Sequence, residues 1–122
     1  MTISTSERED LIRAEALRLG FDLCRFTDID EAWPAAARLF EFVEAGRHGE
    51  MGWMADTAER RKHPRAMWDA ARSAIVLGVN YGPDRDPLEI LKAPDRGAIS
   101  VYAQGDDYHE VIKARLKALA RW

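Results

Sequence analysis

The sequence contains a single cysteine among its 122 residues, and this scarcity excludes several kinds of site. Cys24 has no second cysteine in the chain with which to form a disulfide. Iron–sulfur clusters and cysteine-held metal ions need several thiolates, so this chain alone cannot build such a site. Because Cys24 lies in a short apolar run, we expect it to be a buried core thiol.

Long apolar runs are also absent. The longest fully apolar stretches are only a few residues long, which predicts no transmembrane helix. The first ten residues, MTISTSERED, are polar and acidic, and they lack the apolar segment of a signal peptide. Together with the single cysteine, these features predict a cytoplasmic protein.

Neither sign of charge dominates the chain. It has 18 basic and 21 acidic residues and a net charge of −3, so there is no overall electrostatic attraction to nucleic acid. Apolar residues make up 47% and charged residues 32%, which is typical of a folded globular protein. The length fits one domain with a modest core.

The common catalytic and metal-binding motifs are missing as well. There is no glycine-rich phosphate loop, and no nucleophile motif surrounds Ser73 or Ser100. The three histidines, His48, His63 and His109, are too far apart in sequence to form a metal-binding pair. We interpret them as unrelated surface or helix-capping residues.

Apolar residues recur at helical spacing in three segments. The spacing predicts helices over residues 6–19, over 33–45, and from about residue 107 to the end of the sequence. The expected boundary residues are the capping pairs Ser6–Glu9 and Asp107–Glu110, Pro34 in a first turn, and the terminating glycines Gly20, Gly46 and Gly49.

Three other segments resemble strands, at residues 21–27, 73–82 and 98–103. The run at 73–82 is almost continuously apolar, so we expect it to be buried on both faces. Because strands and helices do not alternate strictly along the chain, the predicted fold class is α+β or an irregular layered α/β structure.

Two further segments are harder to assign. Residues 46–64 are too glycine-rich for a long helix, but DTAERRK can hold one helical turn capped by Asp56 or Thr57, and Pro64 can start another short helix. Residues 82–96 contain three prolines and many charges, which predicts a surface loop.

Two stretches allow either a functional or a purely structural interpretation. Tyr108 and His109 begin a helix, whose free N–H groups suit an anionic or amide-bearing ligand, but Asp106 and Asp107 can simply cap that helix while Tyr108 packs. Similarly, a second set of residues can line a ligand surface or be ordinary core and solvated charge. This second set is Met51, Trp53, Met54, Arg60 and Arg61.

Four stretches in this order resemble the N-terminal part of epoxyqueuosine reductases: HGEMGWM (48–54), ERRKHP (59–64), ARSAIVLGVNYG (71–82) and ISVYAQGDDYHEVIKARLKAL (99–119). The resemblance implies an oxidoreductase that reduces epoxyqueuosine to queuosine in tRNA, the last step of queuosine biosynthesis, using cobalamin and two [4Fe–4S] clusters. It also implies that residues 1–122 form the N-terminal part of a nitroreductase-like or reductive-dehalogenase-like cobalamin-binding domain.

The resemblance assigns roles to five residues. It implies that Arg61 contacts cobalamin, that Ser100 does so through its backbone, and that Asp107, Tyr108 and His109 help to shape the pocket. The family binds cobalamin without a histidine ligand, so His109 is not expected to coordinate cobalt.

The same resemblance places the family's proton-donating aspartate and its cluster cysteines beyond residue 122. We therefore expect no catalytic residue and no metal ligand in this chain, which would be incomplete and inactive alone. Contact with tRNA would come mainly from other parts of a monomeric protein. Two alternatives stay open: a stand-alone domain that binds a corrinoid or a partner protein, and a related cobalamin-dependent reductase such as a dehalogenase. Stability of the isolated chain would favour the first alternative.

Overall fold

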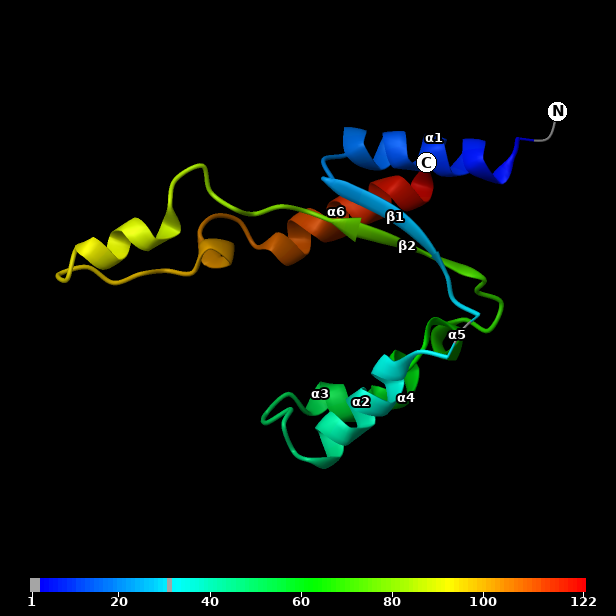
Figure 1. The fold of residues 1–122 in the computed structure, drawn as a ribbon, viewed down its shortest axis with the longest axis horizontal. Coiled ribbons are helices and arrows are strands. Elements are labelled where there is room, and N and C mark those ends of the chain that lie inside the picture. Colours follow the sequence, from blue (N-terminus) through cyan, green and yellow to red (C-terminus); the bar gives the residue numbers. More distant parts are fainter. Residues whose placement is uncertain (1–2, 31) are drawn as a thin grey trace. The chain divides into compact units, whose positions relative to one another are not determined.

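A computed structural model describes residues 3–30 and 32–122 of the protein (Figure 1). In chain order, the elements are α1 (Thr5–Arg18), β1 (Leu23–Asp28), α2 (Pro34–Glu44), α3 (Gly52–Asp56), α4 (Ala58–Arg61), α5 (Pro64–Met67), β2 (Ser73–Gly78), the 3-10 helices η1 (Pro87–Lys92) and η2 (Val101–Ala103), and α6 (Tyr108–Arg121). This mixture of helices with a small sheet confirms the α+β class.

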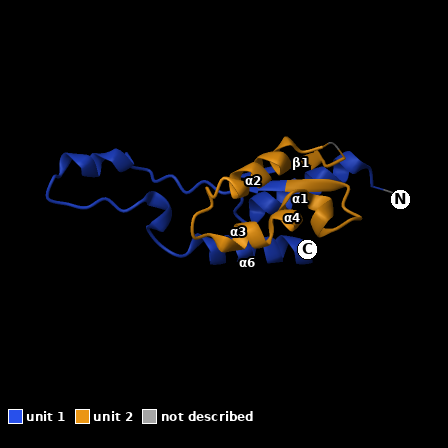
Figure 2. Cartoon of the chain, turned by 90° about the horizontal axis from the view of Figure 1, so that it is seen from below, with its two compact units in different colours: residues 1–25, 76–122 blue, residues 26–75 orange. Residues whose placement is uncertain are grey.

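The chain divides into two units, which Figure 2 colours separately. Unit 1 comprises residues 1–25 and 76–122, and unit 2 comprises residues 26–75. Unit 1 therefore contains α1, η1, η2 and α6, whereas unit 2 contains the four helices α2 to α5. No helix in the described part of the chain is long and apolar enough to cross a membrane.

The two strands form a two-stranded sheet. The N–H of Asp22, just before β1, donates to the carbonyl of Gly78 at the end of β2 over 2.9 Å. The start of one strand therefore meets the end of the other, and the strands run antiparallel (Figure 1). The carboxylate of Asp22 also accepts the N–H of Asn80 over 2.7 Å, which extends this contact past β2.

The expected burial of residues 73–82 on both faces is wrong. Ile75 and Val76 in β2 keep 45% and 50% of their surface exposed. In the described chain β2 has β1 as its partner strand, and a two-stranded sheet offers too little cover to bury both faces of a strand. A strand does begin at Ser73, as predicted, but it ends at Gly78 and not at residue 82. Its β-branched apolar residues favour extended structure whether or not they are covered.

The predicted third strand at residues 98–103 is also wrong. The N–H of Ala103 donates to the carbonyl of Ser100 over 2.9 Å, which closes the 3-10 turn η2. The side chain of Gln104 reinforces the turn by donating from Nε2 to the carbonyl of Ile99 over 2.7 Å. Strand-like alternation over so few residues does not specify a strand unless a neighbouring strand pairs with it. In this segment the backbone and side-chain hydrogen bonds of the turn form instead.

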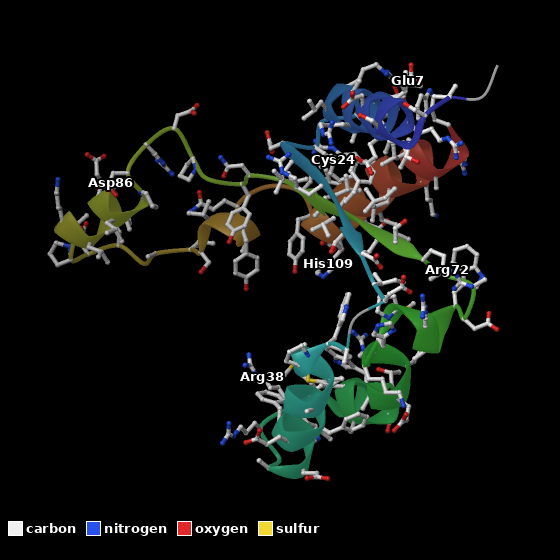
Figure 3. The ribbon with its side chains drawn as sticks, turned by 45° about the vertical axis from the view of Figure 1, so that its right-hand side comes forward. Glu7, Cys24, Arg38, Arg72, Asp86 and His109 are labelled. Atoms are coloured by element: carbon white, nitrogen blue, oxygen red, sulfur yellow. The ribbon has the colours of Figure 1, made fainter. Side chains whose placement is uncertain are left out.

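Helix α1 begins two residues earlier than its predicted capping box. Ser4, not Ser6, is the N-cap: its hydroxyl accepts the N–H of Glu7 over 3.2 Å, and the Glu7 carboxylate accepts the N–H of Ser4 over 2.7 Å. Figure 3 labels Glu7 in this first turn. Hydrogen bonding of the Glu7 carboxylate to the backbone N–H of Ser4, followed by the Ser4 side chain, holds the pKa of Glu7 below its usual value. Both serine–glutamate pairs have the same spacing, so spacing alone could not choose between them.

Gly20 ends α1 as predicted and allows α6 to approach. Its φ of +94° is readily adopted only by glycine. Its carbonyl accepts a 2.7 Å hydrogen bond from Nη1 of Arg115 in α6. A Cβ atom at this position would lie 3.1 Å from the Arg115 guanidinium carbon. The glycine therefore serves both the turn and the contact between the end of α1 and α6.

The core of unit 1 is small. Its fully buried apolar residues are Ala16, Phe21 and Cys24. The burial of Cys24, which is only 1% exposed, confirms that it is a core thiol. No residue of α6 is fully buried, although its predicted apolar face carries Val111, Ile112 and Leu119 at half-buried positions.

In unit 2, α2 starts with Pro34 in its first turn, as predicted. Its end is marked by Gly46, whose φ is +68° and whose N–H donates to the carbonyl of Val43 over 2.9 Å. The expectation of irregular structure over GEMGWM is partly wrong, because α3 begins at Gly52. A glycine costs little in a first turn, so it did not prevent helix formation there.

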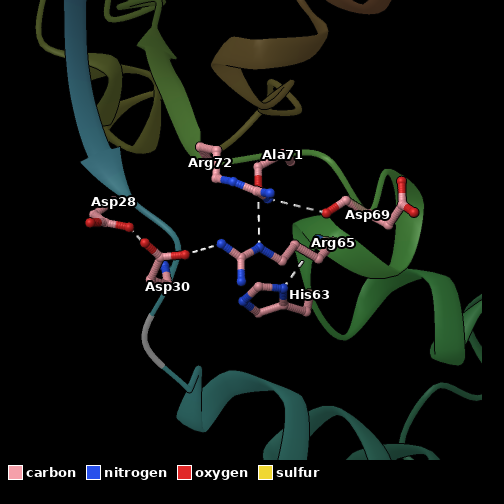
Figure 4. Close-up of polar contacts among 7 residues, drawn as sticks. All are labelled: Asp28, Asp30, His63, Arg65, Asp69, Ala71 and Arg72. Atoms are coloured by element: carbon pink, nitrogen blue, oxygen red, sulfur yellow. Dashed lines mark hydrogen bonds and ion pairs between the residues drawn. The ribbon is translucent and has the colours of Figure 1, made fainter.

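Figure 4 shows how Arg65 links the two ends of unit 2. Its guanidinium contacts the carboxylate of Asp30, in the segment that follows β1. Its Nε donates over 3.0 Å to the carbonyl of Ala71, which precedes β2. Its backbone N–H donates over 3.1 Å to Nδ1 of His63, the N-cap of α5. His63 is therefore a helix-capping histidine, as predicted, and Pro64 starts a short helix.

Candidate functional site

The first turn of α6 is organised by Asp107. This residue is the N-cap, as predicted, and its Oδ1 accepts the N–H of His109 over 2.9 Å. The same oxygen lies 2.8 Å from Nδ1 of His109 (Figure 3 labels this histidine). The predicted partner Glu110 does not complete a capping box and instead pairs with Lys113 over 3.4 Å. Asp107 thus fixes both the start of the helix and the orientation of the His109 ring.

Aromatic rings stack around the same turn. The Tyr108 and His109 rings lie 4.0 Å apart at 27°, and the edge of Tyr102 meets Tyr108 at 6.1 Å and 83°. Between them, Gly105 adopts a φ of +112°, which allows the chain to reverse from η2 into α6. The structural and functional interpretations of the turn are therefore compatible: the capped turn presents a rigid aromatic surface.

A hollow of about 600 Å³ opens beside this turn, entirely within unit 1. Its wall combines apolar and aromatic side chains with a few polar groups that can donate or accept hydrogen bonds. Such a lining suits a large, mainly apolar ligand that carries polar substituents. The lining residues are Val79, Tyr81, Val101, Tyr102, Gln104, Asp106, Tyr108, Val111, Ile112 and Arg115.

Arg61, the first of the predicted site residues, lies in α4 and belongs to unit 2. Its Nε donates to the hydroxyl of Thr57 over 2.7 Å. Its guanidinium carbon lies 4.6 Å from the centre of the Trp53 ring, within range of a cation–π contact. Thr57 is the N-cap residue of α4, as one of the two predicted alternatives, but its side chain makes no capping bond.

The other four predicted residues are near one another in the sequence and share unit 1. Ser100 is exposed and precedes η2, where its carbonyl closes the turn and its side chain makes no capping bond. Asp107, Tyr108 and His109 form the capped aromatic turn. Of these four, Tyr108 lines the hollow.

No group of three or more histidine, cysteine, aspartate or glutamate side chains among residues 3–30 and 32–122 is arranged to hold a metal ion. His63 and His109 each make a local contact at a helix start. His48 differs from both, because its Nδ1 is buried without a hydrogen-bond partner in the described structure.

Sequence reasoning did not identify Tyr81, Tyr102 or Arg115 as lining residues of one hollow. Tyr81 and Tyr102 stand in the stretches VNYG and SVYA, and Arg115 lies on the final helix, but no local pattern brings the three together. Their convergence depends on the turn at η2 and on the packing of α6 with α1, which are tertiary features.

The hydrogen bonds to Asp107 make a pH-dependent contribution to stability. The His109 N–H, followed by the His109 ring, lowers the pKa of Asp107 from its usual 3.8. The carboxylate therefore stabilises the fold above the unfolded-state pKa, and this contribution disappears as pH falls through the lower folded-state pKa. We expect Asp107→Asn to flatten the loss of stability in acid, measured as the urea midpoint against pH.

The neighbouring substitution Asp106→Asn is the matched control, because Asp107 and not Asp106 is the N-cap. Asp106→Asn should lose stability in acid to the same extent as the wild type, measured as the urea midpoint against pH. Equal curves for Asp107→Asn and the wild type would show that the cap does not contribute in this pH range.

Comparison with protein families identifies the chain. Residues 61–122 match the family described as "Epoxyqueuosine reductase QueG, DUF1730". The matched range contains all five predicted site residues and the stretch from Ser100 to His109. The chain belongs to this family.

Curated relatives agree with the family match. Proteins named epoxyqueuosine reductase are 39% identical over 118 residues in Cellulophaga algicola, 40% over 108 residues in Leadbetterella byssophila and 36% over 103 residues in Pseudomonas aeruginosa. The matches cover 96%, 88% and 84% of this chain but 37%, 34% and 28% of the relatives. The chain thus spans about a third of the length of the curated relatives it matches. No solved structure matches it significantly.

Proposed function

We propose that this chain is the N-terminal third of an oxidoreductase that reduces epoxyqueuosine to queuosine in tRNA, within the cytoplasm. The observation that carries this proposal is the family match over residues 61–122. Removing the epoxide oxygen as water requires electrons and protons, and the described residues contain no group of ligands for a redox metal. In this proposal, the electrons, the proton donor and most tRNA contacts come from other parts of a monomeric protein.

We further propose that residues 1–122 form part of a nitroreductase-like, cobalamin-binding domain. The hollow in unit 1 fits one side of such a cofactor, because a corrin ring is broad and flat and carries amide groups around its edge. Val101, Tyr102 and Tyr108 offer an apolar and aromatic wall for the ring. Gln104 and Arg115 on the same wall offer donors for amide oxygens.

Arg61 would supply a further contact in this proposal, and Ser100 one through its backbone. When bound, cobalamin would supply a cobalt centre for two-electron reduction. The residues of this chain would hold and orient the cofactor and keep water from its apolar face. His109 is engaged with Asp107 through Nδ1, and in this proposal it has a structural role at the start of α6.

The test uses the protein expressed from its complete reading frame. We expect it to bind hydroxocobalamin in an absorbance titration and, after reconstitution and reduction, to convert epoxyqueuosine-containing tRNA to queuosine-containing tRNA. Mass spectrometry of the digested nucleosides detects the loss of one oxygen atom. Failure to bind hydroxocobalamin would contradict the cofactor proposal. Binding without conversion of the tRNA would favour a related cobalamin-dependent reductase with another substrate.

A further inference from the structure

Three residues of unit 2 lie along one face of the α3–α4 segment. Trp53, Thr57 and Arg61 are spaced by four residues, the separation that places helical side chains above one another. Two backbone hydrogen bonds bridge the junction between the two helices: Thr57 N–H donates to the Trp53 carbonyl over 3.2 Å, and Arg61 N–H donates to the Thr57 carbonyl over 3.0 Å. The three side chains therefore form one row across the two short helices.

The Thr57 hydroxyl joins its two neighbours in this row. It donates to the carbonyl of Trp53 over 2.6 Å, so its proton is already committed. Its lone pairs are then available to accept the Nε–H of Arg61 over 2.7 Å. The Arg61 guanidinium also stacks on the Trp53 ring at 4.6 Å. An exposed arginine is thus held at two points, its Nε and its planar face.

The Nη1 and Nη2 groups of Arg61 have no partner in the described structure. The acidic residue two positions earlier, Glu59, is engaged by Lys62 at 2.5 Å. The free N–H groups of Arg61 therefore extend from a fixed guanidinium. A planar cation held in this way loses little conformational freedom when it binds amide, carboxylate or phosphate oxygens, which favours affinity.

We propose that Thr57 and Trp53 are positioning residues for Arg61, and that they direct its two amino groups toward oxygen atoms of the bound corrinoid. This inference depends on the proposed cofactor. The oxygens belong either to the amide groups at the corrin edge or to the phosphate of the nucleotide loop, and both are acceptors for the same guanidinium edge.

The test is a double-mutant cycle on the protein expressed from its complete reading frame, with hydroxocobalamin titration as the measurement. Thr57→Val removes the hydroxyl at nearly constant volume and should weaken binding about five- to tenfold. Thr57→Ser retains the hydroxyl and should bind within about twofold of the wild type, which is the matched control. In an Arg61→Ala background, Thr57→Val should have no further effect, because the residue it positions is gone.

A second measurement needs no ligand. The Nε–H signal of Arg61 in a ¹⁵N NMR spectrum should be protected from solvent exchange in the wild type and Thr57→Ser, and should lose this protection in Thr57→Val.

Trp53→Phe, which weakens the cation–π contact, should reduce the affinity for hydroxocobalamin less than Thr57→Val does. Titration with cobinamide, which lacks the phosphate, locates the acceptor: an equal loss for both ligands points to the amides, and a loss for cobalamin alone points to the phosphate.

The outcomes separate this inference from the proposed function. A wild-type protein that does not bind hydroxocobalamin overturns both. A wild-type protein that binds, with independent effects of Thr57→Val and Arg61→Ala or an unchanged Arg61 signal in Thr57→Val, overturns the positioning role alone.

Discussion

Replacing Arg61 by alanine is expected to weaken hydroxocobalamin binding about ten- to a hundredfold. Hydrogen bonds from a charged group contribute about 1.5–3 kcal/mol, which corresponds to this range of affinity. The substitution removes both unpartnered amino groups while leaving the Trp53 and Thr57 side chains in place. Because Arg61 is exposed on a short helix, the fold should tolerate the change, and circular dichroism and urea unfolding should remain close to the wild type.

Arg60→Ala is the matched control for this experiment, since it removes an adjacent exposed arginine and the same charge. Its affinity for hydroxocobalamin should stay within about threefold of the wild type, as expected for loss of an exposed charge of small energetic value. Arg61→Lys should recover only part of the affinity, because lysine has no planar group to stack on Trp53 and cannot present two parallel donors. Equal titrations of Arg61→Ala and the wild type would remove Arg61 from the site.

The helices could be located from the sequence because their signals are local. Pro34 in a first turn, Gly20 after a last turn and Asp107 before α6 each act within a few residues. The choice between the Ser4 and Ser6 capping pairs could not be made in this way, since both pairs satisfy the same spacing. The predicted start of α1 therefore differs from the observed start by no more than the usual uncertainty of a helix end.

The strands show where local signals fail. Residues 98–103 alternate like a strand, but a strand exists only when another strand pairs with it. The structure instead closes η2 through Ser100 and Gln104. Residues 73–78 do pair with β1, but Ile75 and Val76 stay exposed in the described fold. Sequence indicates which residues favour extended structure, but it does not indicate what will cover them.

The Asp107 cap followed from residue type and position and is confirmed. The assignment of Arg61 to a cofactor site came only from the resemblance to the family and stays a prediction. The role of Trp53 could not be chosen from the sequence, because an exposed tryptophan beside methionines suits core and ligand surface equally well. In the structure its ring supports Arg61, an arrangement that depends on the backbone hydrogen bonds that bridge α3 and α4.

Replacing Ile29 by alanine is expected to cost about 2–5 kcal/mol of unfolding free energy, the range for deletion of a large buried aliphatic side chain. Ile29 has no exposed surface, although it stands between aspartates in a stretch that reads as a polar break. A small domain has only about 5–15 kcal/mol of total stability. The variant should therefore unfold at a much lower urea concentration, and Ile29→Val should lose only about 0.5–1.5 kcal/mol because less volume is removed.

Ile99→Ala is the chemically matched control, because it deletes the same atoms from a side chain that is 67% exposed. Its unfolding free energy should lie within about 0.5 kcal/mol of the wild type, as for most surface substitutions. The difference between the two alanine variants then measures burial alone, since both have the same change in side-chain composition. Equal losses at Ile29 and Ile99 would contradict the assignment of Ile29 to the core.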